Sequence, residues 1–166
     1  KTIETKNNCN SICALSDNKR VIIGFCDGVE LWSLLDECVI WRASLAGIRS
    51  VCVDNIMSLV ISGNGRGEIE IKSLDTGHTI AILKGHSYGV NSVQMTPDSR
   101  YVISGSDDMS IKIWDLKKRV CIGTLEGHRK EVTSIAISPD GVLIASAGYT
   151  DQTVRIWDLK SGDCLQ

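Results

Sequence analysis

The sequence has little proline, no long apolar run and no strong excess of charge of one sign. Two of its 166 residues are proline, whereas 43% are apolar and 23% are charged, which is typical of a globular chain that buries a core. Apolar stretches such as VIIGF and SLVIS are far too short to span a bilayer. We therefore expect a soluble protein with no membrane partner.

The charge balance argues against one class of partner. Eighteen basic and twenty acidic residues leave a net charge of −2, so there is no bulk attraction toward nucleic acid or anionic lipid. Recognition of nucleic acid would need a specific basic patch, and the scattered basic residues disfavour it.

The cysteines lack the spacing of a disulfide framework or a zinc site. There are seven of them, an odd number, with no C-x-x-C pair, and the chain has no N-x-S/T glycosylation site. We expect reduced thiols in an intracellular protein, cytoplasmic or nuclear, with most of them small core residues. No metal ion and no cofactor is expected.

One unit recurs along the chain. LKGHSYGVNSVQMTPDSRYVISGSDDMSIKIWDL, ending at 116, is answered by LEGHRKEVTSIAISPDGVLIASAGYTDQTVRIWDL, ending at 159. The same frame, moved back in steps of about 42 residues, aligns two weaker copies, so four units cover nearly the whole chain. We place them at about 1–42, 43–84, 85–126 and 127–166, within one segment covering 1–166.

Each unit has the periodicity of short strands. GVNSVQM, YVISGS, SIKIWDL and RVCIGTL are rich in β-branched residues and are separated by turn sequences such as TPDSR and SPDG. No stretch carries a helical apolar stripe over three turns. The sequence predicts an all-β fold of four four-stranded antiparallel blades, arranged radially as in a propeller.

These residues resemble the WD-repeat β-propeller family over essentially the whole chain. The third unit has GH at 85–86, SGSDD at 104–108 and IKIWDL ending near Trp114, and the fourth has GH at 127–128 and VRIWDL at 154–159. The resemblance implies a buried hydrogen-bonded tetrad in each of these units. Its members would be His86, Ser104, Asp108 and Trp114 in the third, and His128, Ser146, Asp151 and Trp157 in the fourth.

The first two units keep the spacing and lose the tetrad. When the four units are aligned, each tetrad residue defines a column. The second unit has Ser44, Arg66 and Lys72 in the histidine, aspartate and tryptophan columns, and it keeps only the serine of the tetrad, as Ser62. The first unit keeps Trp32 and Asp27, with Thr5 and Ile23 in the other two columns. We expect these units to be held mainly by apolar packing, so that truncation of Lys72 would have little effect.

Two catalytic interpretations compete with the structural one. Histidine, serine and aspartate in one blade also compose a hydrolase triad, but they recur at repeat positions, lack a G-x-S-x-G elbow and have tryptophan as a fourth member. The glycine-rich SGNGRG at 62–67 invites comparison with a phosphate loop. It aligns with a turn between two strands and does not open a helix. We expect no catalytic residue in this segment.

The resemblance implies a protein-interaction scaffold or adaptor. Family members bind protein or peptide partners on the face made by the loops that enter the first strand and join the second to the third. The side chains there that we expect to contact a partner are Arg66, Tyr88, Asp107, Arg129, Lys130, Tyr149 and Thr150. Alternatives are an interaction module of a larger enzyme whose catalysis lies outside this segment, and a propeller associated with nucleic acid.

The number of units raises the question of closure. The resemblance implies a ring that usually has more blades than the four found in this sequence. We expect an arc of a larger ring, or a ring closed by self-association with another copy. A complete ring of four blades is the alternative.

Overall fold

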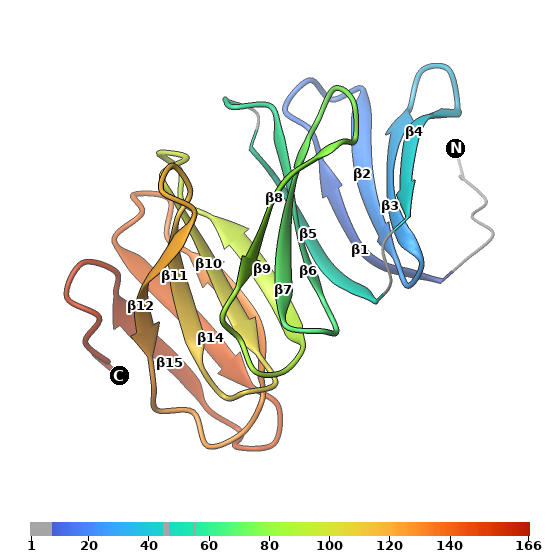
Figure 1. The fold of residues 1–166 in the computed structure, drawn as a ribbon. Coiled ribbons are helices and arrows are strands. Elements are labelled where there is room, and N and C mark those ends of the chain that lie inside the picture. The colour runs from blue at the N-terminus through green and yellow to red at the C-terminus, as the bar shows by residue number, and fades with distance from the viewer. Residues whose placement is uncertain (1–7, 45–46, 55) are drawn as a thin grey trace.

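The computed structural model describes residues 8–44, 47–54 and 56–166 as fifteen strands in four antiparallel sheets (Figure 1). The predicted all-β fold is confirmed. Among these residues there is no helix, and so none long and apolar enough to cross a membrane.

Within each sheet the strands follow one another in chain order. The first sheet contains β1 (Cys9–Ala14), β2 (Arg20–Phe25), β3 (Gly28–Ser33) and β4 (Cys38–Ser44). The second contains β5 (Ile48–Asp54), β6 (Leu59–Asn64), β7 (Glu68–Ser73) and β8 (Thr79–Lys84). The third contains β9 (Val90–Met95), β10 (Tyr101–Ser106), β11 (Ile111–Asp115) and β12 (Val120–Leu125).

The fourth sheet differs from the others at its outer edge. It contains β13 (Val132–Ile137), β14 (Leu143–Gly148) and β15 (Val154–Asp158), and the place of a fourth strand is taken by a single bridge between Trp157 and Cys164. In the third sheet β11 pairs with β12 along its length, from Ile111 to Asp115. The outer edge of β15 is therefore paired less completely than its counterparts.

The turns after the first strands show how the sequence specifies the hairpins. The Asp98 carboxylate accepts a hydrogen bond from the Arg100 amide at 3.1 Å, and Asp140 accepts one from the Val142 amide at 3.0 Å. Between them, Ser99 and Gly141 adopt positive φ. An aspartate that holds its own turn two residues on explains why TPDSR and SPDG separate strands.

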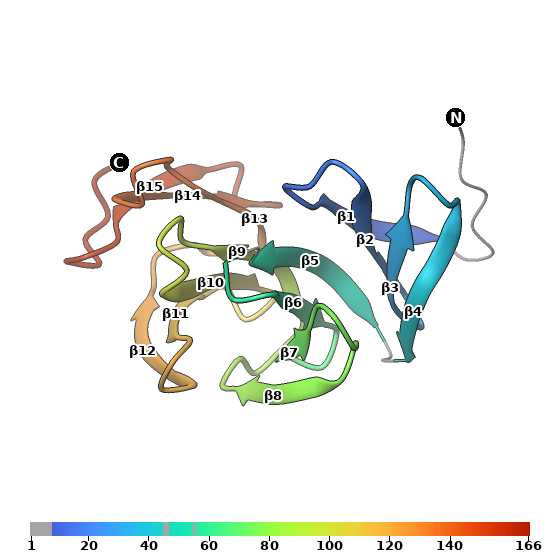
Figure 2. The same ribbon diagram turned by 90° about the horizontal axis from the view of Figure 1, so that it is seen from above.

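The core lies between the sheets. Figure 2 shows the sheets succeeding one another along an arc, with β1–β4 at one end and β13–β15 at the other. Three apolar clusters fill the contacts between consecutive sheets, and each contains residues of both sheets that it joins. Trp114 and Trp157 are almost completely buried in two of these clusters. Each sheet is thus stabilised by its neighbours along the chain.

The expectation that most cysteines are core residues is wrong. Only Cys52 is buried and Cys13 is half-buried, while the other five are exposed free thiols: Cys9, Cys26, Cys38, Cys121 and Cys164. Two of them, Cys38 and Cys121, lie on the outermost strands β4 and β12, where most side chains are exposed. Cysteine is often buried in proteins, but its burial depends on where its strand lies in the sheet.

Candidate functional site

Four side chains of the third sheet form a closed polar network. His86 precedes β9, Ser104 lies on β10, Asp108 in the following turn and Trp114 on β11. The His86 ring lies 2.8 Å from Asp108 Oδ2 through Nδ1 and 2.7 Å from Ser104 Oγ through Nε2. The Trp114 indole N–H donates to the same Oγ at 2.8 Å. The donors and acceptors therefore match in series from tryptophan to aspartate.

The fourth sheet repeats this network with nearly the same geometry. His128 lies 2.8 Å from Asp151 Oδ2 and 2.7 Å from Ser146 Oγ, and Trp157 donates to Ser146 Oγ at 2.8 Å. Each histidine ring is tilted against its tryptophan ring, with centroids 6.0 Å and 6.3 Å apart. Two sheets thus hold the same four residue types in the same arrangement.

Each network has further members that the tetrad alignment did not single out. The Ser110 hydroxyl donates to Asp108 Oδ1 at 2.6 Å, and the Thr153 amide donates to Asp151 Oδ1 at 3.1 Å. The Ser87 and Arg129 amides also donate to these carboxylates, at 3.0 Å and 3.2 Å. The sequence signal for these further members is a serine or threonine two positions after the aspartate, as in DMS and DQT.

Burial and hydrogen bonding set the protonation of the third-sheet network. Burial lowers the pKa of His86, against the opposing effect of the Asp108 carboxylate. Burial alone would raise the pKa of Asp108, but hydrogen bonds from Ser110, His86 and the Ser87 amide lower it to about 2. A neutral imidazole beside an ionised carboxylate is therefore the stable state at neutral pH.

We expect the stability of the fold to fall as the pH drops below neutral. An unfolded histidine takes up a proton near pH 6.5, whereas His86, with its lowered pKa, resists protonation until lower pH. The free energy of unfolding is then highest above pH 6.5 and is lost as the pH falls from 6.5 toward the folded pKa. Each unit of pKa difference contributes about 1.4 kcal/mol.

Urea unfolding at pH 8, 7, 6 and 5 tests this expectation. A His86→Gln variant is the control and should show a shallower decline over the same range. Asp108 adds a second loss below its ordinary pKa of 3.8, because protonation breaks its hydrogen bonds. A wild-type unfolding free energy that rises between pH 7 and pH 5 would contradict the assignment.

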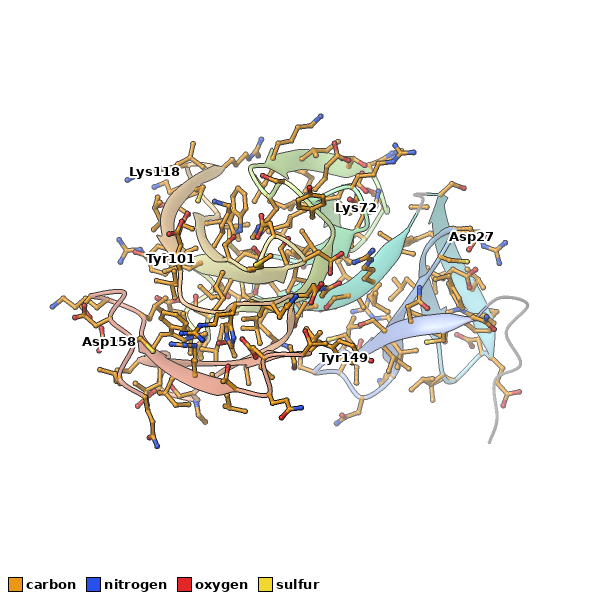
Figure 3. The ribbon with its side chains drawn as sticks, turned by 90° about the horizontal axis from the view of Figure 1, so that it is seen from below. Asp27, Lys72, Tyr101, Lys118, Tyr149 and Asp158 are labelled. Carbon is orange, nitrogen blue, oxygen red and sulfur yellow. The ribbon has the colours of Figure 1, made fainter. Side chains whose placement is uncertain are left out.

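The second sheet has a different buried network in place of the tetrad. Lys72 Nζ lies 2.9 Å from Glu70 Oε1 and 3.0 Å from Thr79 Oγ1, and the Thr79 hydroxyl donates to Glu70. Lys72 is only 3% exposed, and Figure 3 labels it within this sheet. The expectation that Lys72 could be truncated with little effect is therefore wrong, because its removal would leave Glu70 as a buried unpaired charge.

Two oxygens near this network have no hydrogen-bond partner among the described residues. They are Ser62 Oγ and Glu70 Oε2. Ser62 corresponds to Ser104 in the strand pairing. Each serine pairs with the residue that comes two positions before the one in the tryptophan column of its sheet. Without the indole and imidazole of the tetrad, this serine is fully buried with neither of their hydrogen bonds. Burial of an oxygen without a hydrogen bond therefore lowers the stability of the second sheet, and the third sheet, with its complete tetrad, does not have this loss.

The first sheet retains a tryptophan with a new partner. Trp32 donates from Nε1 to Glu30 at 2.7 Å, and Glu30 also pairs with Arg42 at 2.6 Å. Ile23 stands in the serine column, as expected, and packs with Val21 and Phe25. Thr5, which stands in the histidine column of the first unit, lies outside the described residues.

In the second, third and fourth sheets, the turn between the second and third strands is hydrogen-bonded to the linker that enters the same sheet. The Gly65 amide donates to Gly47 O at 2.8 Å, Asp107 to Gly89 O at 2.9 Å, and Tyr149 to Glu131 O at 3.0 Å. These turns and linkers lie together at the lower end of Figure 1. We call this end of the molecule the loop face, formed by the described residues of 26–27, 65–67, 107–110 and 149–153 with the linkers 47, 85–89 and 126–131.

The candidate contact residues all lie on the loop face, in three groups. Tyr149, Thr150, Arg129 and Lys130 are exposed in the fourth sheet's turn and linker, which the Tyr149 amide joins. Tyr88 is exposed in the third sheet's linker, and Arg66 in the second sheet's turn. Met109 is also exposed on this face, at 45%, and the sequence pattern did not single it out.

Two stretches of the chain, residues 77–115 and 119–158, match the family model for the WD domain, G-beta repeat. These two stretches are WD repeats. Each contains one complete tetrad, and the four antiparallel sheets have the arrangement of propeller blades. WD repeats generally mediate protein–protein interaction and are typically not enzymatic.

The chain is also similar to the meiotic recombination protein rec14 of Schizosaccharomyces pombe. The two are 28% identical over 94 residues, which is 55% of this chain and 31% of the relative. The chain therefore matches less than a third of that protein's length.

The WD-repeat tetrad geometry opposes a catalytic role for its serines. Ser104 Oγ lies between the imidazole and the indole N–H, and the residue is fully buried. An attacking hydroxyl must reach a substrate carbonyl, which this arrangement prevents. Among the described residues, no group of three or more His, Cys, Asp or Glu side chains could hold a metal ion.

Asp107 differs from the other WD-repeat contact candidates because its carboxylate is already engaged. Arg49 of the second blade donates to it at 2.6 Å, and Asn91 of the third donates at 2.7 Å. These hydrogen bonds lower the pKa of Asp107 although its burial acts in the opposite direction. Asp107 therefore joins two blades at the loop face.

The glycine-rich turn of the second blade has a packing explanation. Gly67 has a φ of 80°, and a Cβ at this position would lie 2.7 Å from the carbonyl oxygens of His86 and Tyr88. Asn64 Oδ1 holds the turn by accepting hydrogen bonds from the Arg66 and Glu68 amides. Glycine is needed here because one blade's turn meets the next blade's linker.

Proposed function

We propose that this chain is a non-catalytic scaffold that binds protein or peptide partners through its loop face. The observation that carries the proposal is the exposure of Tyr88 and Tyr149, at 66% and 74%, on adjacent blades of that face. Tyrosine loses little conformational entropy on binding and is frequent among the residues that dominate interface energies. The main chain of both is held by a hydrogen bond: the Ser106 hydroxyl donates to Tyr88 O, and the Tyr149 amide donates to Glu131 O.

The charges around Tyr149 support a partner with acidic groups. Arg129 and Lys130 are exposed in the linker whose Glu131 carbonyl accepts from the Tyr149 amide. Asp151, the nearest aspartate in the turn, is held in the tetrad with a lowered pKa and is turned to His128. An aromatic ring beside two exposed cations suits a peptide that combines acidic and apolar side chains.

The likeness to rec14 covers 94 residues at 28% identity, so we take no cellular process from it, and the proposal stands on the geometry of the loop face.

Affinity purification from cell extract tests the proposal with paired variants. Wild-type protein should retain a stable partner, and Tyr88→Ala combined with Tyr149→Ala should weaken that complex by at least about tenfold, because each anchor is worth more than about 1 kcal/mol. The affinity for the recovered partner is then measured directly by titration.

Ile56→Ala is the matched control. Ile56 is 76% exposed, at the end of the molecule opposite the loop face, in the turn between β5 and β6. Its substitution should leave the complex unchanged. A complex that survives the double tyrosine change and is lost on Ile56→Ala would place binding on the other face and overturn the proposal.

A further inference from the structure

A cavity lies between the third and fourth blades, toward the end of the molecule opposite the loop face. Its volume is about 580 Å³, within the range of about 300–1,000 Å³ that small-molecule sites have. Tyr101 and Ile113 of the third blade and Leu159 of the fourth give it apolar walls. Figure 3 labels Tyr101 and Asp158 on its two sides. The cavity is thus an internal feature of the arc, bounded by a blade on each side.

The corresponding space between the first and second blades is filled by a tryptophan. Trp41 on β4 donates from Nε1 to Leu74 O of the second blade at 2.7 Å, and its ring packs against the cluster between these blades. The ring also lies on the turn that follows Leu74, since a Cβ on Gly77 would come within 2.8 Å of Trp41 Cε3. The outermost strand of one blade is therefore anchored on the next blade by an indole.

The strand pairing places Gly123 of the third blade at the position of Trp41. Trp41 pairs with Leu31 and Gly123 pairs with Ile113, and in both sheets the register shifts directly after that pair. A Cβ on Gly123 would come no closer than 3.4 Å to another residue, which is ordinary van der Waals contact. Gly123 itself lines the cavity. Glycine therefore leaves open the space that an indole fills two blades earlier.

The facing wall of the cavity keeps the form of the wall that receives Trp41. Leu159 and Leu74 each follow directly on the third strand of their blade. Gly162 and Gly77 each come three residues later, with φ of 78° and 71°. In both turns the glycine amide donates to the carbonyl four residues before it at 2.9 Å. Leu159 O is thus the counterpart of the carbonyl that accepts from Trp41.

Leu125 narrows the cavity without filling it. It stands at the position of Ala43, since it pairs with Ile111 as Ala43 pairs with Val29. Leu125 Cδ2 would lie 3.2 Å from a Cβ on Gly162, so the side chain forms the inner wall of the cavity. The volume of about 580 Å³ is that which remains with this leucine in place. A ring that enters therefore packs against its methyl groups.

The charges beside the cavity favour an acidic partner. Lys160 lines the cavity and is exposed, and none of the described residues forms a hydrogen bond or ion pair with its ammonium group. Asp158, which also lines the cavity, accepts hydrogen bonds from the Ser161 amide at 2.8 Å and the Lys160 amide at 2.9 Å, and these lower its pKa. The carboxylate of Asp158 is thus held by its own turn, whereas the Lys160 cation is left for a carboxylate of the partner.

We propose that this cavity binds a tryptophan side chain of a partner protein, with an acidic residue beside it in the same segment. The indole N–H donates to Leu159 O, the ring packs against Tyr101 and Leu125, and the acidic residue pairs with Lys160. The four tryptophans of the sequence already donate their indole N–H groups within the fold: Trp32, Trp41, Trp114 and Trp157. The occupant therefore belongs to another protein, and its site is separate from the loop face.

Titration of the full-length protein with short peptides tests the site. The probes are acetyl-Asp-Trp-Asp-amide, acetyl-Lys-Trp-Lys-amide and acetyl-Asp-Ala-Asp-amide. The first should bind saturably, with methyl NMR shifts confined to the cavity, at Ile113, Ile122, Leu125 and Leu159. The lysine peptide should bind about fivefold more weakly, because an exposed ion pair is worth up to about 1 kcal/mol. The alanine peptide should not bind.

Gly123→Trp is the decisive variant, because it places an indole of the protein itself in the cavity. It should abolish peptide binding without lowering the melting temperature. Ile82→Trp is the matched control, since it adds the same ring at an exposed position of β8 and should leave binding unchanged. Lys160→Glu should reverse the preference between the aspartate and lysine peptides.

Three results would overturn the proposal. The first is no saturable binding of the aspartate peptide, which is also the result if another segment of the protein already fills the cavity. The second is a set of shifts confined to the loop face, and the third is binding that survives Gly123→Trp. If that variant does not fold, Gly123→Leu provides a smaller obstruction at the same position and should still weaken binding.

Discussion

Replacement of Trp114 by alanine is expected to lower the free energy of unfolding by about 3–5 kcal/mol. The indole is 1% exposed and lies in the cluster that joins the second and third blades, against residues such as Ile61, Ile71 and Leu83. Its removal leaves a cavity between two blades, and Ser104 loses the N–H donor 2.8 Å away. Both effects act on the same interface.

Urea unfolding followed by far-ultraviolet circular dichroism measures this loss. Tyr149→Ala removes an aromatic ring that is 74% exposed and should change stability by no more than about 0.5 kcal/mol. Trp114→Phe should fall between the two, since it restores part of the packing and not the N–H. Equal losses for Trp114→Ala and Tyr149→Ala would refute the placement of the indole in the core.

Replacement of Lys72 by methionine is expected to destabilise the fold by about 3–5 kcal/mol. Methionine fills the space but leaves Glu70, which is 5% exposed, without its cation. Thr79 then remains as the hydrogen-bond donor to that carboxylate. A buried charge that loses its partner keeps its full desolvation cost.

The matched control is Lys84→Met, which breaks an exposed pair with Glu68 at 3.0 Å. Its expected effect is below about 1 kcal/mol, because water already screens both groups. A Lys72→Met, Glu70→Leu double variant should recover most of the stability lost by the single change, since both charges leave the core together. If Lys72→Met is as mild as Lys84→Met, the buried pair does not form.

The repeat could be found from the sequence because the residue at each tetrad position recurs in a second unit. His86 and His128, or Ser104 and Ser146, recur at one spacing, and a single period predicted both networks. Lys72 and Thr79 stand at their repeat positions in one blade alone, and the glutamate beside them recurs only as Glu30 of the first blade. Charged residues at alternate strand positions normally indicate a solvated face, but Glu70 and Lys72 are 5% and 3% exposed, on the face of β7 opposite to the isoleucines that pack against the third blade.

The fold class could also be predicted, whereas the details at the edges could not. β-branched runs between aspartate turns define strands and their order, so four antiparallel sheets follow from pattern alone. Asp107 was expected to be a contact residue because its partner Arg49 is far away in the sequence and near only across a blade interface.

The hydrogen bonds from turn to linker bear on how this surface can change over evolution. At Gly47, Gly89 and Glu131 the acceptor is a backbone carbonyl, and the donor in each turn is a backbone amide. The shape of the loop face therefore does not depend on which side chains are present at Tyr149 or Arg129. Such a framework lets side chains diverge to suit new partners while the main chain beneath them keeps its form.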